Sequence, residues 1–205
     1  MTRYYGFHSS ICDATRWMFL FGRTQIIRDL SIQPNETVLE VGCGTGRNFG
    51  PIQARLGVKG RLIGVDCSAP MLARAEQRIH RFGWRNANIV DSEYGRKPGA
   101  RGETDVVIMS YSLSMMPDWQ QVLRCAKSEL EPGGRIGIVD FLAADRRHQA
   151  ANRFADWMRW NHVEMDRPYE NVLVSMFEPA LFISRPACGG LWTFFRYTGG
   201  ARSCP

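Results

Sequence analysis

A glycine-rich turn directly after an apolar run is the feature that most constrains this chain. Residues 38–46 read VLEVGCGTG, a short hydrophobic stretch followed by glycines at every second position, Gly42, Gly44 and Gly46. A near-continuous apolar run is typical of a buried parallel strand. Glycines directly after it allow a tight turn and a close approach of bare backbone to a ligand. The chain is therefore expected to bury this strand in a sheet and to hold a ligand mainly with main-chain atoms.

A second strand is predicted to end at Asp66, twenty residues after Gly46 and directly behind the apolar run RLIGV (residues 61–65). An acidic residue at the end of the second strand is placed to accept hydrogen bonds from ribose hydroxyls. The glycine spacing departs from the G-x-G-x-x-G of dinucleotide sites and lacks the G-K-[ST] ending of a phosphate loop. The turn and the acid together predict a nucleoside cofactor without a pyrophosphate. The alternative is an ordinary tight turn from strand to helix.

Strand-like and helical stretches alternate along the rest of the chain. We expect strands at about 37–41, 61–66, 88–91, 105–109, 135–141, 172–177 and 191–197. We expect helices at about 47–56, 68–82, 118–130 and 149–164. This alternation predicts right-handed crossovers and an α/β fold: a Rossmann-like, doubly wound, mainly parallel seven-stranded sheet with helices on both faces.

The length of 205 residues fits one domain, residues 1–205. We expect residues 1–30 to be a helical lid or substrate segment, with a helix from about 14 to 30, and residues 31–205 to be the cofactor-binding core. The aromatic and basic residues of the prefix would also suit a membrane surface, and the two roles are compatible.

The spacing of the cysteines and the distribution of charge limit which metals and partners this chain is expected to bind. The six cysteines are far apart, with no C-x-x-C and no Cys/His metal pattern, so we expect reduced thiols and no metal. The start of the chain lacks the apolar core of a signal peptide, and a cytoplasmic protein is expected. The net charge of +6 comes from scattered basic residues without a block of like charge, which argues against nucleic acid as a partner.

Residues 40–46 (EVGCGTG) resemble the first motif of class I S-adenosylmethionine-dependent methyltransferases. Residues 4–23 are similar to the amino-terminal signature of one group within that class, the N-methyltransferases that trimethylate diacylglycerylhomoserine to make betaine lipid. Residues 110–119 (SYSLSMMPDW) and 190–197 (GLWTFFRY) also resemble this group. The resemblance implies S-adenosylmethionine as cofactor, an amphipathic lipid amine as substrate, and a peripheral contact with the inner membrane face.

Two other functions stay open from the residues alone. One is methylation of a soluble small molecule or a quinone, with the prefix serving only as a lid. The other is a protein that kept the fold and binds the cofactor without catalysing a reaction.

The resemblance implies a role for each residue of the cofactor site. Glu40 would orient the glycine loop and the amino-acid end of the cofactor, and Asp66 would hold the ribose. Met71 would pack against adenine, although it also fits an ordinary helix core. Asp91 would face the adenine amino group, although it also fits a strand-end cap. The predicted cofactor-binding set is Arg16, Trp17, Glu40, Gly42, Gly44, Gly46, Asp66, Cys67, Met71, Asp91, Ser92 and Ser110.

Methyl transfer from a sulfonium requires near-attack geometry and exclusion of water more than a dedicated acid or base. The predicted catalytic residues are Tyr5, His8 and Tyr111, with Tyr111 beside the methyl group and His8 as a proton acceptor. Aromatic faces attract the quaternary ammonium that successive methylations create. Asp140 would steer that cation, and a capping role is equally open for it. The predicted substrate-binding set is Asp140, Trp160, His162, Tyr169 and Tyr197.

Overall fold

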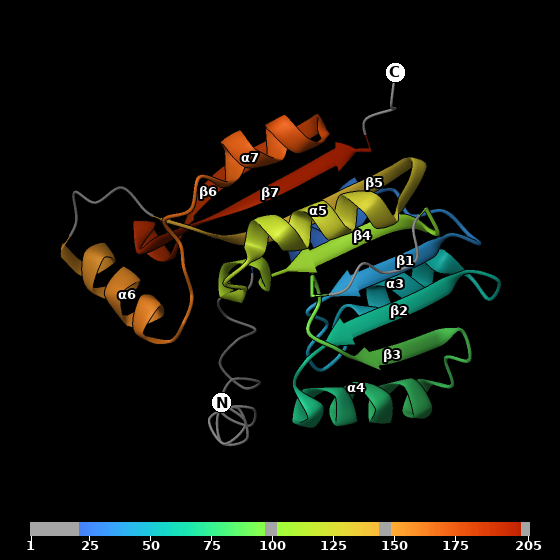
Figure 1. The fold of residues 1–205 in the computed structure, drawn as a ribbon. Coiled ribbons are helices and arrows are strands. Elements are labelled where there is room, and N and C mark those ends of the chain that lie inside the picture. Colours follow the sequence, from blue (N-terminus) through green and yellow to red (C-terminus); the bar gives the residue numbers. More distant parts are fainter. Residues whose placement is uncertain (1–20, 97–101, 144–148, 202–205) are drawn as a thin grey trace.

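The computed structural model describes residues 21–96, 102–143 and 149–201 (Figure 1). Its strands are β1 (Thr37–Val41), β2 (Arg61–Asp66), β3 (Ala87–Asp91), β4 (Thr104–Ser110), β5 (Leu130–Leu142), β6 (Glu178–Ala187) and β7 (Trp192–Gly200). Its helices are α2 (Arg23–Asp29), α3 (Phe49–Leu56), α4 (Ala69–Phe82), α5 (Trp119–Glu129), α6 (Gln149–Trp160) and α7 (Tyr169–Met176), with short 3-10 turns η1 (Leu113–Met115) and η2 (Cys188–Gly190).

All seven strands join one sheet, in the order β3-β2-β1-β4-β5-β7-β6. Strands β3, β2, β1, β4 and β5 are parallel, and β7 runs antiparallel between β5 and β6. The register pairs Val41 with Val65, Asp66 with Asp91, and Ser110 with Val139. The predicted doubly wound, mainly parallel sheet is confirmed, and its register aligns the carboxyl ends of the parallel strands along one edge.

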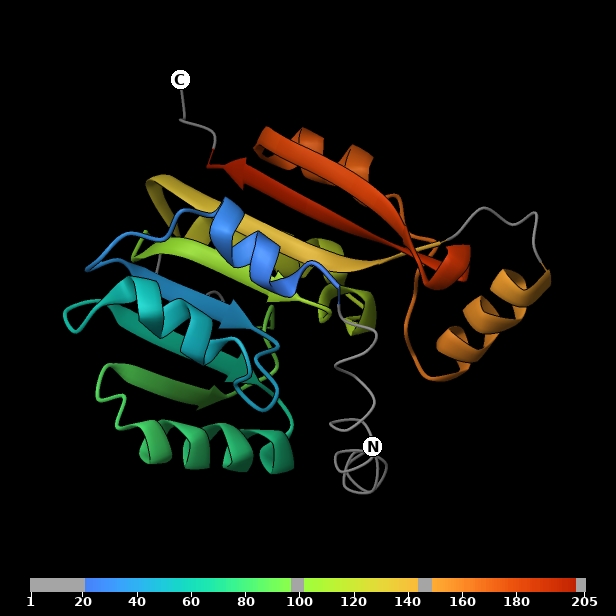
Figure 2. The same cartoon turned by 180° about the vertical axis from the view of Figure 1, so that it is seen from behind.

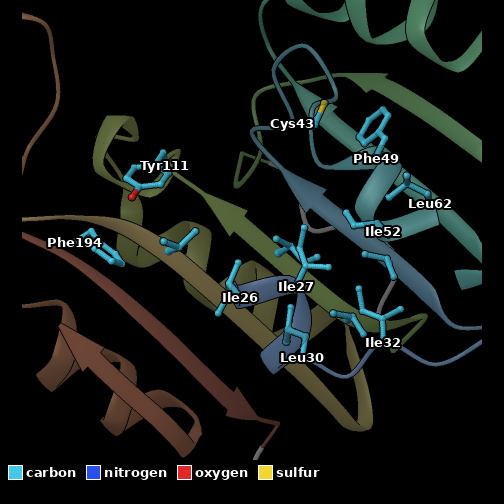
Figure 3. Close-up of a cluster of buried hydrophobic side chains, with 14 of the residues drawn as sticks. Ile26, Ile27, Leu30, Ile32, Cys43, Phe49, Ile52, Leu62, Tyr111 and Phe194 are labelled. Carbon is cyan, nitrogen blue, oxygen red and sulfur yellow. The ribbon is translucent and has the colours of Figure 1, made fainter. Parts of the chain in front are cut away.

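Helices α2, α3 and α4 cover one face of this sheet (Figure 2). Figure 3 shows Ile26, Ile27 and Leu30 of α2 in the same buried cluster as Phe49 of α3. Helix α2 lies close against β5, because a Cβ added at Gly137 would stand 2.5 Å from Cδ1 of Leu30. The described end of the prefix is thereby fixed to the middle of the sheet by close packing.

Helices α5 and α7 cover the opposite face (Figure 1). Alternate residues of a strand serve the two faces: Val38 of β1 belongs to the cluster under α2, whereas Leu39 belongs to the cluster under α5 and α7. Because the central strands are buried on both sides, they read as continuous apolar runs in the sequence.

The expected strand at 172–177 is wrong, because this segment lies in and just after helix α7. Tyr169, Leu173 and Phe177 are all fully buried at intervals of four residues, which is the spacing of a helix and not of a strand. The edge strand β6 follows instead and contains Pro179 and Pro186. An edge position tolerates proline because one side of the strand has no ladder to complete.

Two helices begin without a side-chain cap. Ser68 precedes α4 with an extended backbone, Pro70 lies in the first turn, and the Ser68 hydroxyl caps no backbone amide. Asp118 likewise precedes α5 without a side-chain capping bond. Within the described ranges, no helix has both the length and the apolar character needed to cross a bilayer.

Replacing Gly22 by alanine is expected to lower the free energy of unfolding by about 2 kcal/mol. Gly22 precedes α2 with a φ of 82°, and a Cβ there would lie 2.9 Å from Cε2 of Phe194 and 3.0 Å from Cδ of Arg196. Chemical denaturation measures the loss. Gly83→Ala is a matched control, because Gly83 has a φ of 66° but nothing within 4 Å of its added Cβ. Equal losses in the two variants would contradict the tight contact.

Candidate functional site

The glycine loop follows β1 at the carboxyl edge of the sheet, and its three glycines have different neighbours. Gly42, Gly44 and Gly46 have φ values of 71°, 54° and 69°, in the left-handed region that favours glycine. A Cβ at Gly42 would lie 2.4 Å from Cβ of Ser112, and one at Gly46 would lie 2.8 Å from Cδ2 of Phe49. A Cβ at Gly44 would meet nothing within 4 Å. The outer glycines are therefore needed for packing, and Gly44 leaves open space where a ligand can approach the backbone.

Asp66 ties the glycine loop to the start of α4. Its carboxylate accepts a hydrogen bond from the amide of Gly44 at 2.8 Å and another from the amide of Ser68 at 2.9 Å. Each carboxylate oxygen has a second lone pair, so the group can also accept from a ribose hydroxyl. The structure thus gives Asp66 a loop-shaping role that the sequence did not reveal, beside the predicted ribose contact.

Replacing Asp66 by alanine is expected to weaken cofactor binding by about 2 kcal/mol, since hydrogen bonds to a charged group contribute ~1.5–3 kcal/mol. The loss combines the ribose contact with the release of the amides of Gly44 and Ser68. Calorimetry with S-adenosylhomocysteine measures it. Asp91→Ala is the comparison, because Asp91 is exposed at the end of the neighbouring strand and should cost less. An unchanged affinity in Asp66→Ala would remove Asp66 as the ribose acceptor.

Glu40 carries a buried carboxylate beside the glycine loop. The Nδ2 amide of Asn48 donates to its Oε1 at 2.6 Å, and Arg23 donates to Oδ1 of Asn48 at 2.9 Å. The other oxygen, Oε2, is buried without a hydrogen-bond partner. Burial raises the pKa of Glu40 to about 7, against the lowering influence of Arg23 and Asn48. A buried acceptor of this kind is costly unless a ligand donor completes it, and an ammonium group would do so.

Sequence reasoning missed the two residues that support Glu40. Arg23 and Asn48 are 25 positions apart, and neither belongs to a motif that points to a carboxylate. Only the packing of α2 beside the start of α3 brings them together. Arg23 donates a hydrogen bond to Asn48, and Asn48 donates one to Glu40. These two hydrogen bonds hold the Glu40 carboxylate in one orientation.

Other predicted cofactor residues lie along the same edge. Met71 is half-buried in the first turn of α4, Cys67 is exposed directly after β2, and Asp91 is exposed at the end of β3. The amide of Ser92 donates to the carbonyl of Asp66 at 3.0 Å. Ser110 ends β4, and its hydroxyl oxygen is buried without a partner. The structure thus gathers these residues at one edge, and their contacts with the cofactor stay predictions.

Tyr111 has a structural role beside its predicted catalytic one. It is buried, and its backbone has a φ of 55°. Its hydroxyl donates to the carbonyl oxygen of Phe21 at 2.6 Å, and its ring meets Phe141 edge-on with centroids 4.7 Å apart. Burial also raises the pKa of the hydroxyl. Tyr111 thus anchors the residue before Gly22, and its predicted place beside the methyl group stays a prediction.

Asp140 has the capping role that the sequence left open. It is wholly buried, and its carboxylate accepts from the amides of Ser114 at 2.9 Å and Phe141 at 2.7 Å. Burial raises the pKa of this carboxyl, and the bonds from Ser114 and Phe141 oppose the shift. The carboxylate therefore holds η1 in place after β4, which is the capping role, and its contact with a substrate stays a prediction.

Two aromatic residues of the predicted substrate-binding set belong to the core in this structure. Tyr169 and Tyr197 are wholly buried in the core beneath α7, and the Tyr197 hydroxyl donates to the carbonyl of Leu173 at 3.2 Å. Trp160 and His162 are exposed at the end of α6, so their substrate contacts stay predictions. The remaining predicted residues, Tyr5, His8, Arg16 and Trp17, lie outside the described residues. In the part of the chain that the structure describes, no group of three or more His, Cys, Asp or Glu side chains could hold a metal ion.

The sheet and the edge site define the class of this protein. The sheet has five parallel strands and an antiparallel β7 between β5 and β6, with a glycine loop after β1 and an acid at the end of β2. These features make up the class I methyltransferase fold. The cofactor of this class is S-adenosylmethionine. The unpartnered Glu40 oxygen suits the ammonium group of this cofactor, and the Asp66 carboxylate suits its ribose. The open side of Gly44 leaves room for the cofactor against the main chain.

Comparison with known proteins agrees with this class. Residues 38–134 match the family model described as "Methyltransferase domain". The arsenite methyltransferase of Halobacterium salinarum is 31% identical over 110 residues, which cover 54% of this chain and 28% of that protein. The demethylmenaquinone methyltransferase of Oceanobacillus iheyensis is 27% identical over 118 residues, which cover 58% of this chain and 50% of that protein. The chain thus spans half or less of the length of these two relatives.

A solved structure extends the likeness over almost the full chain. The SAM-dependent methyltransferase of Aquifex aeolicus superposes with a TM-score of 0.67 at 16% identity and covers 94% of this chain and 96% of that one. At this identity the likeness concerns the fold. The likeness over almost the whole chain and the family match over residues 38–134 place this protein among chains with the class I methyltransferase fold.

Proposed function

We propose that this protein transfers the methyl group of S-adenosylmethionine to the amine of a lipid head group such as diacylglycerylhomoserine, in up to three successive steps. The observation that carries the proposal is the buried Glu40 carboxylate with an unpartnered Oε2, two residues before the glycine loop in which Gly44 leaves open space. The amine acceptor is supported by the resemblance of residues 110–119 and 190–197 to betaine-lipid N-methyltransferases. The net charge of +6 suits an anionic lipid surface.

The residues of the chain divide the work of binding and orientation. Glu40, oriented by Asn48, would accept a hydrogen bond from the ammonium group of the cofactor. Asp66 would accept from the ribose, and the open space at Gly44 would let the cofactor approach the main chain. S-adenosylmethionine supplies a methyl group activated by a positively charged sulfur. Since displacement needs only alignment and exclusion of water, the described residues supply position more than acid or base chemistry.

A quinone is the second candidate acceptor. The relative from Oceanobacillus iheyensis is named a demethylmenaquinone methyltransferase, and several further relatives have the same name. Quinones, like lipid amines, are amphipathic, so both acceptors suit a site that opens beside exposed aromatic side chains. The chemistry differs in the atom that receives the methyl group, which product analysis distinguishes.

The test is incubation with isotopically labelled S-adenosylmethionine and a total lipid extract, with a demethylated quinone in a parallel reaction. We expect label in an amine lipid whose mass rises by successive methyl groups. Label only in the quinone would replace the first acceptor by the second. Label in neither, with normal binding of S-adenosylhomocysteine by calorimetry, would reject both acceptors and keep the cofactor site. The Gly44→Ala variant serves as the inactive control.

A further inference from the structure

Helix α6 exposes aromatic surface that the fold does not use. Trp157 is 55% exposed and Trp160 is 72% exposed. Together with the exposed Arg153, they follow at intervals of four and three residues and so lie on one face of the helix. The opposite face contains the buried Ala151 and Met158. The helix is thus anchored from one side and presents its two tryptophans to solvent. We call Arg153, Trp157 and Trp160 the α6 patch.

The α6 patch contains one basic residue, Arg153, and Asp156 lies one turn further along the helix with its side chain 73% exposed. Arg159, the other basic residue of the helix, forms ion pairs with Asp156 at 2.9 Å and Asp166 at 2.7 Å. Arg153 forms no ion pair with any residue in the described ranges. Arg153 lies one turn before Trp157, and the three positions fall within about 60° of each other around the helix at 100° per residue. The patch is therefore two indoles and one arginine on the same side of the helix, and the neighbouring acid, Asp156, is engaged by Arg159.

The α6 patch belongs to the end of the molecule at which the cofactor site opens. Figure 1 shows α6 beyond the edge toward which β1, β2 and β4 point. Aromatic side chains link its inner face to that edge. The ring of Phe154 stacks on the ring of Trp192 with centroids 5.1 Å apart, and the ring centroids of Trp192 and Phe21 are 6.3 Å apart. Phe21 is the residue whose carbonyl Tyr111 holds at the end of β4. A surface that receives the patch would consequently face the acceptor side of the site.

We propose that the α6 patch docks this protein on the surface of an anionic lipid bilayer. Indole rings combine an apolar body with a polar N–H and settle at the headgroup level of membranes, where arginine pairs with lipid phosphate. The net charge of +6 adds attraction to an anionic surface. A stable protein–protein interface takes about 20–30 residues from each partner, far more than this single helix face supplies, which favours a membrane over a protein.

Flotation with vesicles tests the docking. We expect the protein to float with vesicles of phosphatidylcholine and phosphatidylglycerol, more weakly with phosphatidylcholine alone, and less as salt rises. The double variant Trp157→Ser, Trp160→Ser should bind the anionic vesicles at least about tenfold more weakly, as should Arg153→Gln to a smaller extent. Phe82→Ser is the matched control, because Phe82 is 54% exposed on α4, on another part of the molecule, and binding should not change.

The outcomes separate this proposal from the proposed function, on which it rests only for the choice of a lipid surface. Unchanged flotation of the double variant would overturn the docking. If that variant floated normally but lost self-association, the patch would be a protein interface, and the docking would again be overturned. Vesicle binding without methylation of any lipid would reject the acceptor and keep the docking. Methylation of detergent-solubilised lipid without vesicle binding would reject the docking and keep the acceptor. Calorimetry with S-adenosylhomocysteine should give the same affinity in every variant and so verifies folding.

Discussion

Replacing Gly44 by alanine should abolish cofactor binding and leave the fold intact. The added Cβ would meet nothing of the protein within 4 Å, so the substitution costs only the left-handed backbone, about 1–2 kcal/mol. The methyl group would instead stand in the space that the cofactor needs. We expect the affinity for S-adenosylhomocysteine to fall about 100-fold or more, which corresponds to ~3 kcal/mol. Calorimetry measures binding, and thermal unfolding without ligand measures the fold.

Gly42→Ala is the contrasting variant for this experiment. Its Cβ would lie 2.4 Å from Cβ of Ser112, so overpacking of about 1–3 kcal/mol adds to the backbone cost. This variant should lose much more stability than Gly44→Ala. Normal cofactor affinity in a folded Gly44→Ala protein would mean that the cofactor does not approach the loop, and the whole site would have to be placed elsewhere.

The second prediction concerns Glu40→Gln, which should weaken cofactor binding and stabilise the cofactor-free protein above pH 7. Loss of a charge-assisted contact with the ammonium group costs about 2–3 kcal/mol of binding, a fall of roughly 30- to 150-fold. The stability gain arises because the variant removes a buried charge. In the natural protein the ionised Glu40 carboxylate is buried with Oε2 unpartnered. The rise of its pKa from 4.5 to about 7 corresponds to about 3 kcal/mol of disfavoured ionisation.

The sign follows from proton linkage. Because the pKa of Glu40 is raised in the folded state, its favourable contribution is complete below pH 4.5 and is lost as the pH rises through about 7. The Glu40→Gln variant has no such loss, so its stability should exceed that of the natural protein at pH 8 and the difference should vanish toward pH 4.5. Thermal unfolding from pH 5 to pH 8 measures the change, and parallel stability curves would contradict it.

Cofactor affinity should show the complementary pH dependence. In the natural protein, binding should weaken below about pH 7 as Glu40 becomes protonated, whereas Glu40→Gln should bind weakly at every pH. Titration calorimetry with S-adenosylhomocysteine at pH 6 and pH 8 distinguishes the two. An affinity that stays constant with pH in the natural protein would show that the unpartnered oxygen does not meet the cofactor's ammonium group.

Most of the sheet could be predicted from the sequence, because each buried parallel strand is a short, nearly continuous run of apolar residues. The expected bounds of β1 at 37–41 and the end of β2 at Asp66 are those of the structure. The failure at 172–177 has a physical reason. The run NVLV resembles a buried strand, and only the spacing of Tyr169, Leu173 and Phe177 across a longer window indicates a helix.

The candidate site was predictable in part for the same reason. Gly42, Gly44, Gly46 and Asp66 stand at the ends of strands, and a parallel sheet brings such ends to one edge whatever else the chain does. A position near this edge did not by itself ensure an exposed side chain. Asp140 lies near the end of β5, yet its carboxylate is buried and accepts from the amides of Ser114 and Phe141, and Tyr197 is buried as well.

The sequence by itself determined the parallel sheet, the glycine loop and the acid after β2, since each depends on neighbours within a few residues along the chain. The tertiary structure alone decided that Tyr111 holds the Phe21 carbonyl, that Asn48 and Arg23 support Glu40, and that α6 exposes its tryptophans. The reason is that burial and hydrogen-bond partners depend on which distant segments pack together. A side chain's chemistry is local, but its access to a ligand is a property of the whole fold.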